Sequence, residues 1–162
     1  MNVGMGTVAI AAMFLFVAPA QAASDGKRIQ PDFPEGSQTQ SCVGLNSKPT
    51  AGTMLNLNDC RLPRDNFFAV AHDGTITIAA HPELCIATAG PVTKDGVGLE
   101  LVRCAANTPK WIWAGKAGRS GTIRSEPGVC WAYMPMTENE HAFPFVLSAM
   151  RCSTGGMLFS VH

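Results

Sequence analysis

Residues 121–131 read GTIRSEPGVCW, and residues 74–86 read GTITIAAHPELCI. In both stretches a Gly-Thr-Ile triplet is followed, about ten residues later, by a cysteine and then a bulky apolar residue. The recurrence indicates an internal repeat. A repeat of a few dozen residues is typical of folds in which several copies of one small unit bury a common core that no single copy could form.

The six cysteines extend this repeat to three copies. Alternate cysteines recur 43 and 45 residues apart in one series (42, 85, 130), and 44 and 48 residues apart in the other (60, 104, 152). Because equivalent positions of a repeat should pair equivalently, the predicted disulfides are Cys42–Cys60, Cys85–Cys104 and Cys130–Cys152. A chain rich in such bridges is typical of an oxidising, extracytoplasmic environment.

An apolar residue at every second position precedes the second cysteine of each copy, as expected of a strand with one buried face. The pairs are Leu55 and Leu57, Leu99 and Leu101, and Leu147 and Ala149. The dipeptide Asp73-Gly74 marks the tight corner of a hairpin in HDGTITI. No helical period is convincing anywhere. The sequence therefore predicts an all-β chain, a β-trefoil of three four-stranded repeats with one disulfide per repeat.

An apolar run at Thr7–Ala18 is followed by APAQA, a small-residue pattern that a signal peptidase recognises. We expect a signal peptide over residues 1–22, a flexible N-terminal tail over 23–40 and the β-trefoil domain over 41–162. The apolar run is too short to span a bilayer. The predicted location is therefore secreted or periplasmic, with no membrane span.

Composition excludes several functions. Lys and Arg together number 12, as do Asp and Glu, and a neutral chain without a basic run lacks the electrostatic footprint of a nucleic-acid-binding protein. There is no C-x-x-C or H-x-x-x-H spacing for zinc, and no G-x-S-x-G, H-E-x-x-H or phosphate-binding glycine loop. We therefore predict a non-enzymatic protein without metal or cofactor, whose partners are neutral glycans or glycoconjugates, or a companion protein chain.

From about Ser41 to the C-terminus, the chain resembles the ricin B-type lectin domain, a β-trefoil family. The resemblance rests on the cysteine spacing, the apolar strand before each second cysteine, the aromatic residue after it and the Gly-Thr-Ile strand. The family's Gln-x-Trp signature reads here as NFF (66–68), WIW (111–113) and MLF (157–159). Its sugar-binding Asp, two residues after the first cysteine, is replaced by Gly44, Ala87 and Ala132.

The resemblance implies candidate carbohydrate-binding residues near the expected pockets. Asp65, Asn66 and Asn107 lie where the family has an Asn or Gln that binds sugar. The two interpretations of Trp111 are a core residue and an exposed sugar platform, whereas Trp113 is expected in the core. Trp131 and Tyr133 lie where the family has the floor of its pocket, and we expect Trp131 in the core and Tyr133 facing a loop.

The function expected from this resemblance is that of a secreted carbohydrate-binding module with an altered pocket. The alternative is a non-catalytic accessory subunit, for protein interaction or toxin delivery, in which the sugar sites are lost. The accessory subunits of cytolethal distending toxins offer an analogy of fold alone. A protease-inhibitor trefoil, which presents one exposed loop, stays open as a third class.

Overall fold

The computed structural model describes residues 26–33, 41–61, 67–92, 96–116, 119–125, 128–134, 146–155 and 157–162. The described residues form twelve strands and one four-residue helix, α1 (Cys152–Gly155). The strands are β1 (Ile29–Pro31), β2 (Ser41–Leu45), β3 (Leu55–Asp59), β4 (Phe68–Val70), β5 (Ile76–Ile78), β6 (His81–Thr88), β7 (Val97–Arg103), β8 (Ile112–Trp113), β9 (Gly121–Ser125), β10 (Val129–Met134), β11 (Val146–Arg151) and β12 (Leu158–Val161). The prediction of an all-β chain is confirmed.

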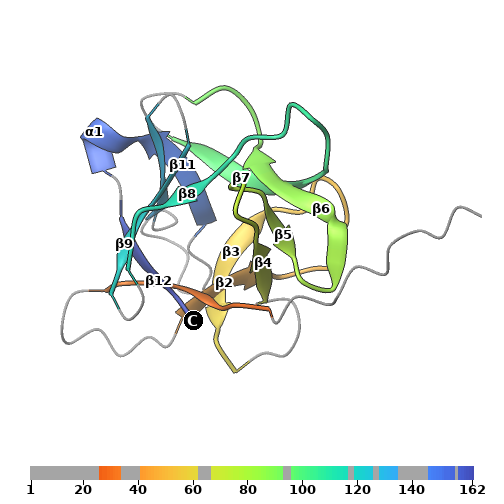
Figure 1. Cartoon of the computed structure of the whole chain (residues 1–162), viewed down its shortest axis with the longest axis horizontal. Coiled ribbons are helices and arrows are strands. Elements are labelled where there is room, and N and C mark those ends of the chain that lie inside the picture. The colour runs from red at the N-terminus through yellow and green to blue at the C-terminus, as the bar shows by residue number, and fades with distance from the viewer. Residues whose placement is uncertain are drawn as a thin grey trace, which may run out of the picture.

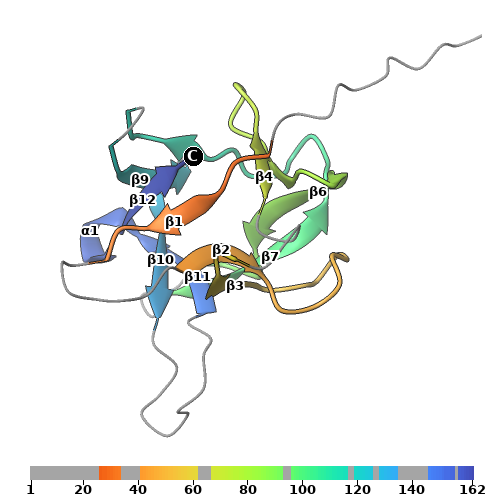
Figure 2. The ribbon, with the colours of Figure 1, turned by 90° about the horizontal axis from the view of Figure 1, so that it is seen from below.

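The strands form one near-closed, barrel-like sheet (Figure 1). Its main path runs β1-β12-β9-β10-β11-β7-β6-β5-β4, with β2, β3 and β8 paired beside it. Lys27, which precedes β1, exchanges two backbone hydrogen bonds with Phe68 of β4, so the two ends of the path meet. Figure 2 shows the strands arranged around a common centre.

Three hairpins of this sheet, β2–β3, β6–β7 and β10–β11, share one register. In each, the first cysteine lies opposite the residue two places before the second cysteine: Cys42 opposite Asn58, Cys85 opposite Val102 and Cys130 opposite Met150. The disulfides are Cys42–Cys60, Cys85–Cys104 and Cys130–Cys152. All three predicted pairings are confirmed, and they are compatible with an oxidising, extracellular environment.

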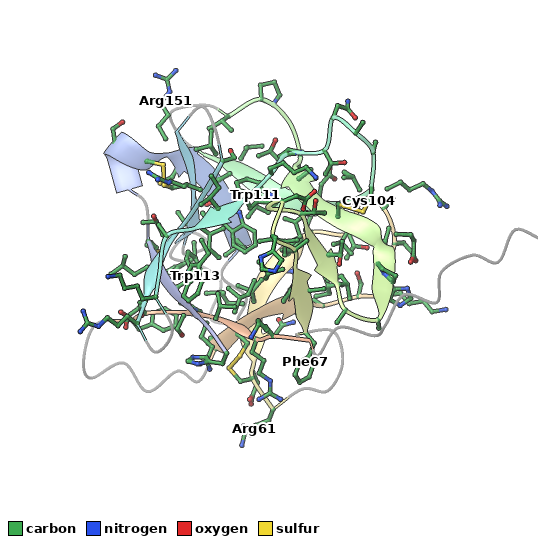
Figure 3. The ribbon with its side chains drawn as sticks, in the orientation of Figure 1. Arg61, Phe67, Cys104, Trp111, Trp113 and Arg151 are labelled. Carbon is green, nitrogen blue, oxygen red and sulfur yellow. A yellow bond between two sulfur atoms is a disulfide. The ribbon has the colours of Figure 1, made fainter. Side chains whose placement is uncertain are left out.

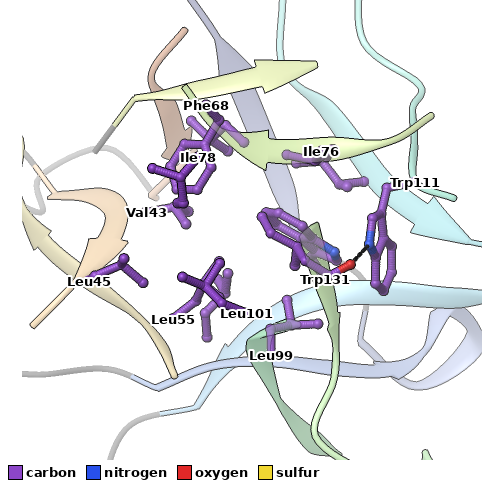
Figure 4. Packing of buried hydrophobic residues seen from close by; sticks show 14 of the residues in the cluster. Val43, Leu45, Leu55, Phe68, Ile76, Ile78, Leu99, Leu101, Trp111 and Trp131 are labelled. Atoms are coloured by element: carbon purple, nitrogen blue, oxygen red, sulfur yellow. Dashed lines mark hydrogen bonds between the residues drawn. The ribbon is translucent and has the colours of Figure 1, made fainter. Parts of the chain in front are cut away.

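The core is formed by buried side chains of these three hairpins together with those of the other strands of the sheet. The predicted apolar pairs before the second cysteines are all fully buried: Leu55, Leu57, Leu99, Leu101, Leu147 and Ala149. Phe68 of β4 and Ile76 and Ile78 of β5 pack into the same cluster, which Figure 4 shows from close by. Full burial of a large aliphatic or aromatic side chain contributes about 1.5–3 kcal/mol, so this cluster is the main source of stability.

The corner between β4 and β5 is built as the sequence predicts. Gly74 has a φ of 84°, in the left-handed region that favours glycine. The Oδ1 atom of Asp73 accepts a hydrogen bond from the backbone N–H of Thr75 at 2.9 Å, and this closes the turn. The predicted hairpin at Asp73-Gly74 is therefore confirmed.

The N-terminal segment differs from the prediction of a flexible tail over 23–40. Within it, β1 pairs with β12 in antiparallel register, with Ile29 opposite Val161 and Pro31 opposite Phe159. Ile29 is 0% exposed. The tail prediction is thus wrong for residues 26–33, because β1 fills a place in the barrel and buries an apolar side chain there. The expected signal peptide and residues 34–40 lie outside the described residues.

Candidate functional site

The three positions where the ricin-type family has its sugar-binding Asp lie inside the sheet. Gly44, Ala87 and Ala132 occupy β2, β6 and β10, and all three are buried. Ala132 is 1% exposed, and its carbonyl accepts a hydrogen bond from the fully buried Ser148 hydroxyl at 3.3 Å. Without a carboxylate, and without exposure, these positions offer no charge-assisted acceptors for sugar hydroxyls.

Two of the candidate tryptophans belong to the core. Trp111 is 1% exposed, and its Nε1 atom donates a hydrogen bond to the carbonyl of Ile86 at 2.8 Å (Figure 4). Trp131 is 0% exposed and contacts Trp111 and Phe159 edge to face, with ring centroids 5.6 and 6.0 Å apart. The surface-platform interpretation of Trp111 is therefore wrong, and the core interpretation of Trp131 is confirmed.

Trp113 lies nearer the surface than Trp111 (Figure 3). Its side chain is half-buried, packs against the core cluster and donates a hydrogen bond from Nε1 to the carbonyl of Phe159 at 3.1 Å. The prediction that Trp113 lies in the core is therefore only partly correct, because its ring packs against the core but is also partly exposed. Ile112, between the two tryptophans, points to the opposite face and is 48% exposed.

Tyr133 is the candidate that keeps both an aromatic ring and access to solvent. It lies near the end of β10, is half-buried, and contacts the ring of Phe33 with centroids 5.1 Å apart and planes tilted by 55°. Burial raises the pKa of the Tyr133 phenol. Phe33 is also half-buried and packs against the core cluster. We call these two residues the aromatic pair.

Sequence reasoning missed Phe33, because it fell within the expected tail. A signal was nonetheless present. A Gly-Thr-Ile strand precedes Cys85 and another precedes Cys130, so a third copy of this pattern would have a corresponding strand before Cys42. That strand is β1, and Phe33 follows it by two residues.

The polar candidates are not brought to the aromatic pair by any contact among the described residues. Asn107 is exposed, in a turn after β7 that is closed by hydrogen bonds between Ala105 and Thr108. Asp65 and Asn66 lie outside the described residues. Asn107 is thus accessible, but it is placed on a different hairpin from Tyr133.

Two exposed ion pairs fix carboxylates on the surface. The Arg61 guanidinium, hydrogen-bonded to the side chain of Asp59, lowers the pKa of that carboxyl to about 2. Lys110 donates to Asp73 at 2.7 Å, and Thr75 donates to the same carboxylate from its backbone N–H and its hydroxyl; these bonds hold the pKa of Asp73 well below its ordinary value. Figure 3 shows Arg61 pointing away from the sheet. Each carboxylate is occupied by a cation of the chain itself.

Among the described residues, no group of three or more His, Cys, Asp or Glu side chains could hold a metal ion. None of the helices in that part of the chain has the length and apolar character needed to cross a membrane. Neither a protein-family model nor a curated protein matches this chain. Among the residues that the resemblance suggested for carbohydrate binding, Tyr133 is the aromatic one that solvent reaches, and with Phe33 it forms the candidate site.

Proposed function

We propose that this chain is a secreted glycan-binding module with a β-trefoil fold. The twelve strands divide into three sets of four: β1–β4, β5–β8 and β9–β12. Each set contributes one disulfide-closed hairpin, and the sets are joined by the strand pairs β4–β5, β8–β9 and β12–β1. The identical register of the three hairpins supports this threefold arrangement.

The observation that carries the glycan-binding proposal is the aromatic pair. The apolar C–H face of a sugar ring stacks on an aromatic side chain such as that of Tyr133. Because the planes of the two rings are tilted by 55°, they can contact a ligand from two directions. The proposed site differs from that of the ricin-type family, because it lacks the family's Asp and adds Phe33, which follows β1.

A second function is favoured by a separate observation. The family's carboxylate is missing at Gly44, Ala87 and Ala132, and all three positions are buried. A protein that does not bind sugar would not need a carboxylate at these three positions. The alternative is therefore an accessory subunit whose surface contacts a companion protein.

The test is a glycan array probed with the oxidised protein, residues 23–162, displayed multivalently. A single shallow site has a Kd of roughly 0.1–1 mM, which registers only with avidity. We expect defined binding that Tyr133→Ala removes, because the variant deletes the stacking surface. Tyr133→Phe is the matched control: it keeps the ring and should retain most of the binding.

Folding of each variant is checked by far-UV circular dichroism and by thermal unfolding. A blank array from folded wild-type protein would contradict the glycan-binding proposal and favour the accessory subunit. Binding that survives Tyr133→Ala in a folded variant would contradict the assignment of the site to the aromatic pair.

A further inference from the structure

The residues of β8 and β9 with their surroundings form the most basic part of the chain. Residues 101–125 contain five basic residues, Arg103, Lys110, Lys116, Arg119 and Arg124, and no acidic one. All 12 acidic residues of the chain lie outside this stretch. Residues 101–125 are therefore positively charged, although the net charge of the whole chain is zero.

Of these five cations, only Lys110 forms a salt bridge with another described residue. Lys110 is held by Asp73, whereas Lys116, Arg119 and Arg124 make no salt bridge within the described part of the chain, and all three are exposed. Lys116 and Arg119 lie in the connection between β8 and β9, where the N–H of Arg119 donates to the carbonyl of Lys116 at 2.8 Å. Their charge is available to a partner.

Arg124 projects from the outer face of β9. Along this strand Gly121, Ile123 and Ser125 are buried, so Thr122 and Arg124 point outward. Arg124 lies opposite Ile112 of β8, and Thr122 lies opposite Leu158 of β12. Figure 1 shows these three strands side by side.

Apolar side chains flank the cations on this face. Ile112 and Leu158 are each 48% exposed, more than any other large hydrophobic residue whose side chain the structure describes. We call the outer surface formed by the following residues the β9 face: Ile112, Lys116, Arg119, Thr122, Arg124 and Leu158. At its edge, exposed Asp32 follows β1, and its N–H donates to the carbonyl of Leu158.

The cations of the β9 face are spread along a hairpin and do not converge on one point. A strand rises about 3.3 Å per residue, so Arg124 lies roughly 10–15 Å along the hairpin from the loop with Lys116 and Arg119. Such spacing suits a linear polymer with repeated anionic groups. Guanidinium groups form paired hydrogen bonds with sulfate or carboxylate oxygens, and Ile112 and Leu158 can cover the C–H edges of sugar rings.

We propose that the β9 face binds a polyanionic glycan, that is, a sulfated or carboxylated polysaccharide. This site is separate from the aromatic pair and does not depend on the function proposed for it. The oxidising environment that suits the three disulfides is also one in which extracellular polysaccharides are encountered.

The test measures binding of the oxidised protein, residues 23–162, to immobilised heparin, with uncharged dextran as the reference. We expect binding to heparin alone, weakening several-fold as NaCl rises from roughly 50 to 500 mM, because salt screens exposed charges. The triple variant Lys116→Gln/Arg119→Gln/Arg124→Gln should weaken binding about tenfold or more.

The matched control removes the same three units of charge elsewhere, at the exposed residues Lys27, Lys48 and Arg61, each changed to Gln. It should bind heparin within about twofold of wild type. An equal loss in both triple variants would overturn the proposal, because net charge would then explain the binding. Failure of the wild type to bind heparin would overturn it too.

A duplex DNA oligonucleotide and vesicles of anionic phospholipid are the competing probes. Binding to either one as tight as to heparin, with the same sensitivity to the β9-face variant, would overturn the assignment to a glycan. Tyr133→Ala separates the two sites: it should leave heparin binding unchanged whether or not the aromatic pair binds a neutral sugar.

Discussion

Ile29→Ala tests whether β1 is an integral strand of the barrel. Ile29 is 0% exposed and lies in the core cluster, opposite Val161 of β12. Truncation removes three buried carbon groups, each worth about 0.8 kcal/mol of transfer free energy. The cavity that remains adds a further cost, so we expect a loss of about 3 kcal/mol, within the roughly 2–5 kcal/mol typical of such changes.

The measurement is the free energy of unfolding of oxidised protein from urea denaturation, together with the melting temperature. A loss of about 3 kcal/mol should lower the melting temperature by roughly 10 °C for a domain of this size. Lys27→Ala is the control, since Lys27 is exposed and pairs with Phe68 only through its backbone; we expect a change within about 0.5 kcal/mol. An Ile29→Ala variant as stable as Lys27→Ala would refute the placement of β1 and restore the flexible tail.

The remaining predictions concern single interactions. Trp111→Phe should destabilise by about 1–3 kcal/mol, because it leaves a buried carbonyl without its donor; Trp131→Phe should cost less than Trp111→Phe, because the Trp131 Nε1 atom has no hydrogen-bond partner among the described residues. NMR titration of Asp59 should give a midpoint near 2 that rises toward 3.8 in Arg61→Ala, and the small stabilisation from this pair should be present above the unfolded pKa and lost as pH falls through 2. Gly74→Ala should lower the melting temperature, because a Cβ at a φ of 84° is strained and would lie 3.0 Å from a backbone oxygen; an unchanged melting temperature would contradict this.

The disulfides and hairpins could be predicted because their signals are local. Each pair of cysteines brackets one hairpin, and period-two apolar residues such as Leu99 and Leu101 mark its inner face. The repeat then restricts the pairing to one choice. Each disulfide-closed hairpin spans only about twenty residues, so its pattern of cysteines and apolar residues can be read directly from the sequence.

The place of β1 could not be read in the same way, because its partners are remote. Ile29 pairs with Val161 at the other end of the chain, and Lys27 pairs with Phe68. The strand is three residues long and ends in Pro31, which normally weakens a strand assignment. Only the repeat argument points to it. Phe33 is therefore the site residue that sequence reasoning had least chance of finding.

The sequence left Trp111 open between a core and a surface position and placed Trp113 in the core, whereas Trp111 is the more buried of the two. Alignment to the family signature matched Trp113 with Phe68 and Phe159, the aromatic residues that fill the core in the other copies. Phe159 follows Cys152 by seven positions, as Trp111 follows Cys104, and both side chains are buried. After Cys60, in contrast, the buried aromatic residue is Phe68, eight positions on, so the distance from the cysteine places the core residue only to within one position.

The dependence of the aromatic pair on β1 links binding to folding. The N–H of Asp32 donates to the carbonyl of Leu158 directly before Phe33, so we expect the contact between Phe33 and Tyr133 to depend on the docking of β1 on β12. A change that loosens β1, such as Ile29→Ala, should therefore weaken both stability and ligand binding. Tyr133→Ala should weaken binding far more than stability, because its half-buried ring contributes less to the core than a fully buried one. The β9 face borders β1 through Leu158 of β12, but its three cations lie on β9 and in the β8–β9 connection, so heparin binding should follow the stability of the sheet and not the contact between Phe33 and Tyr133.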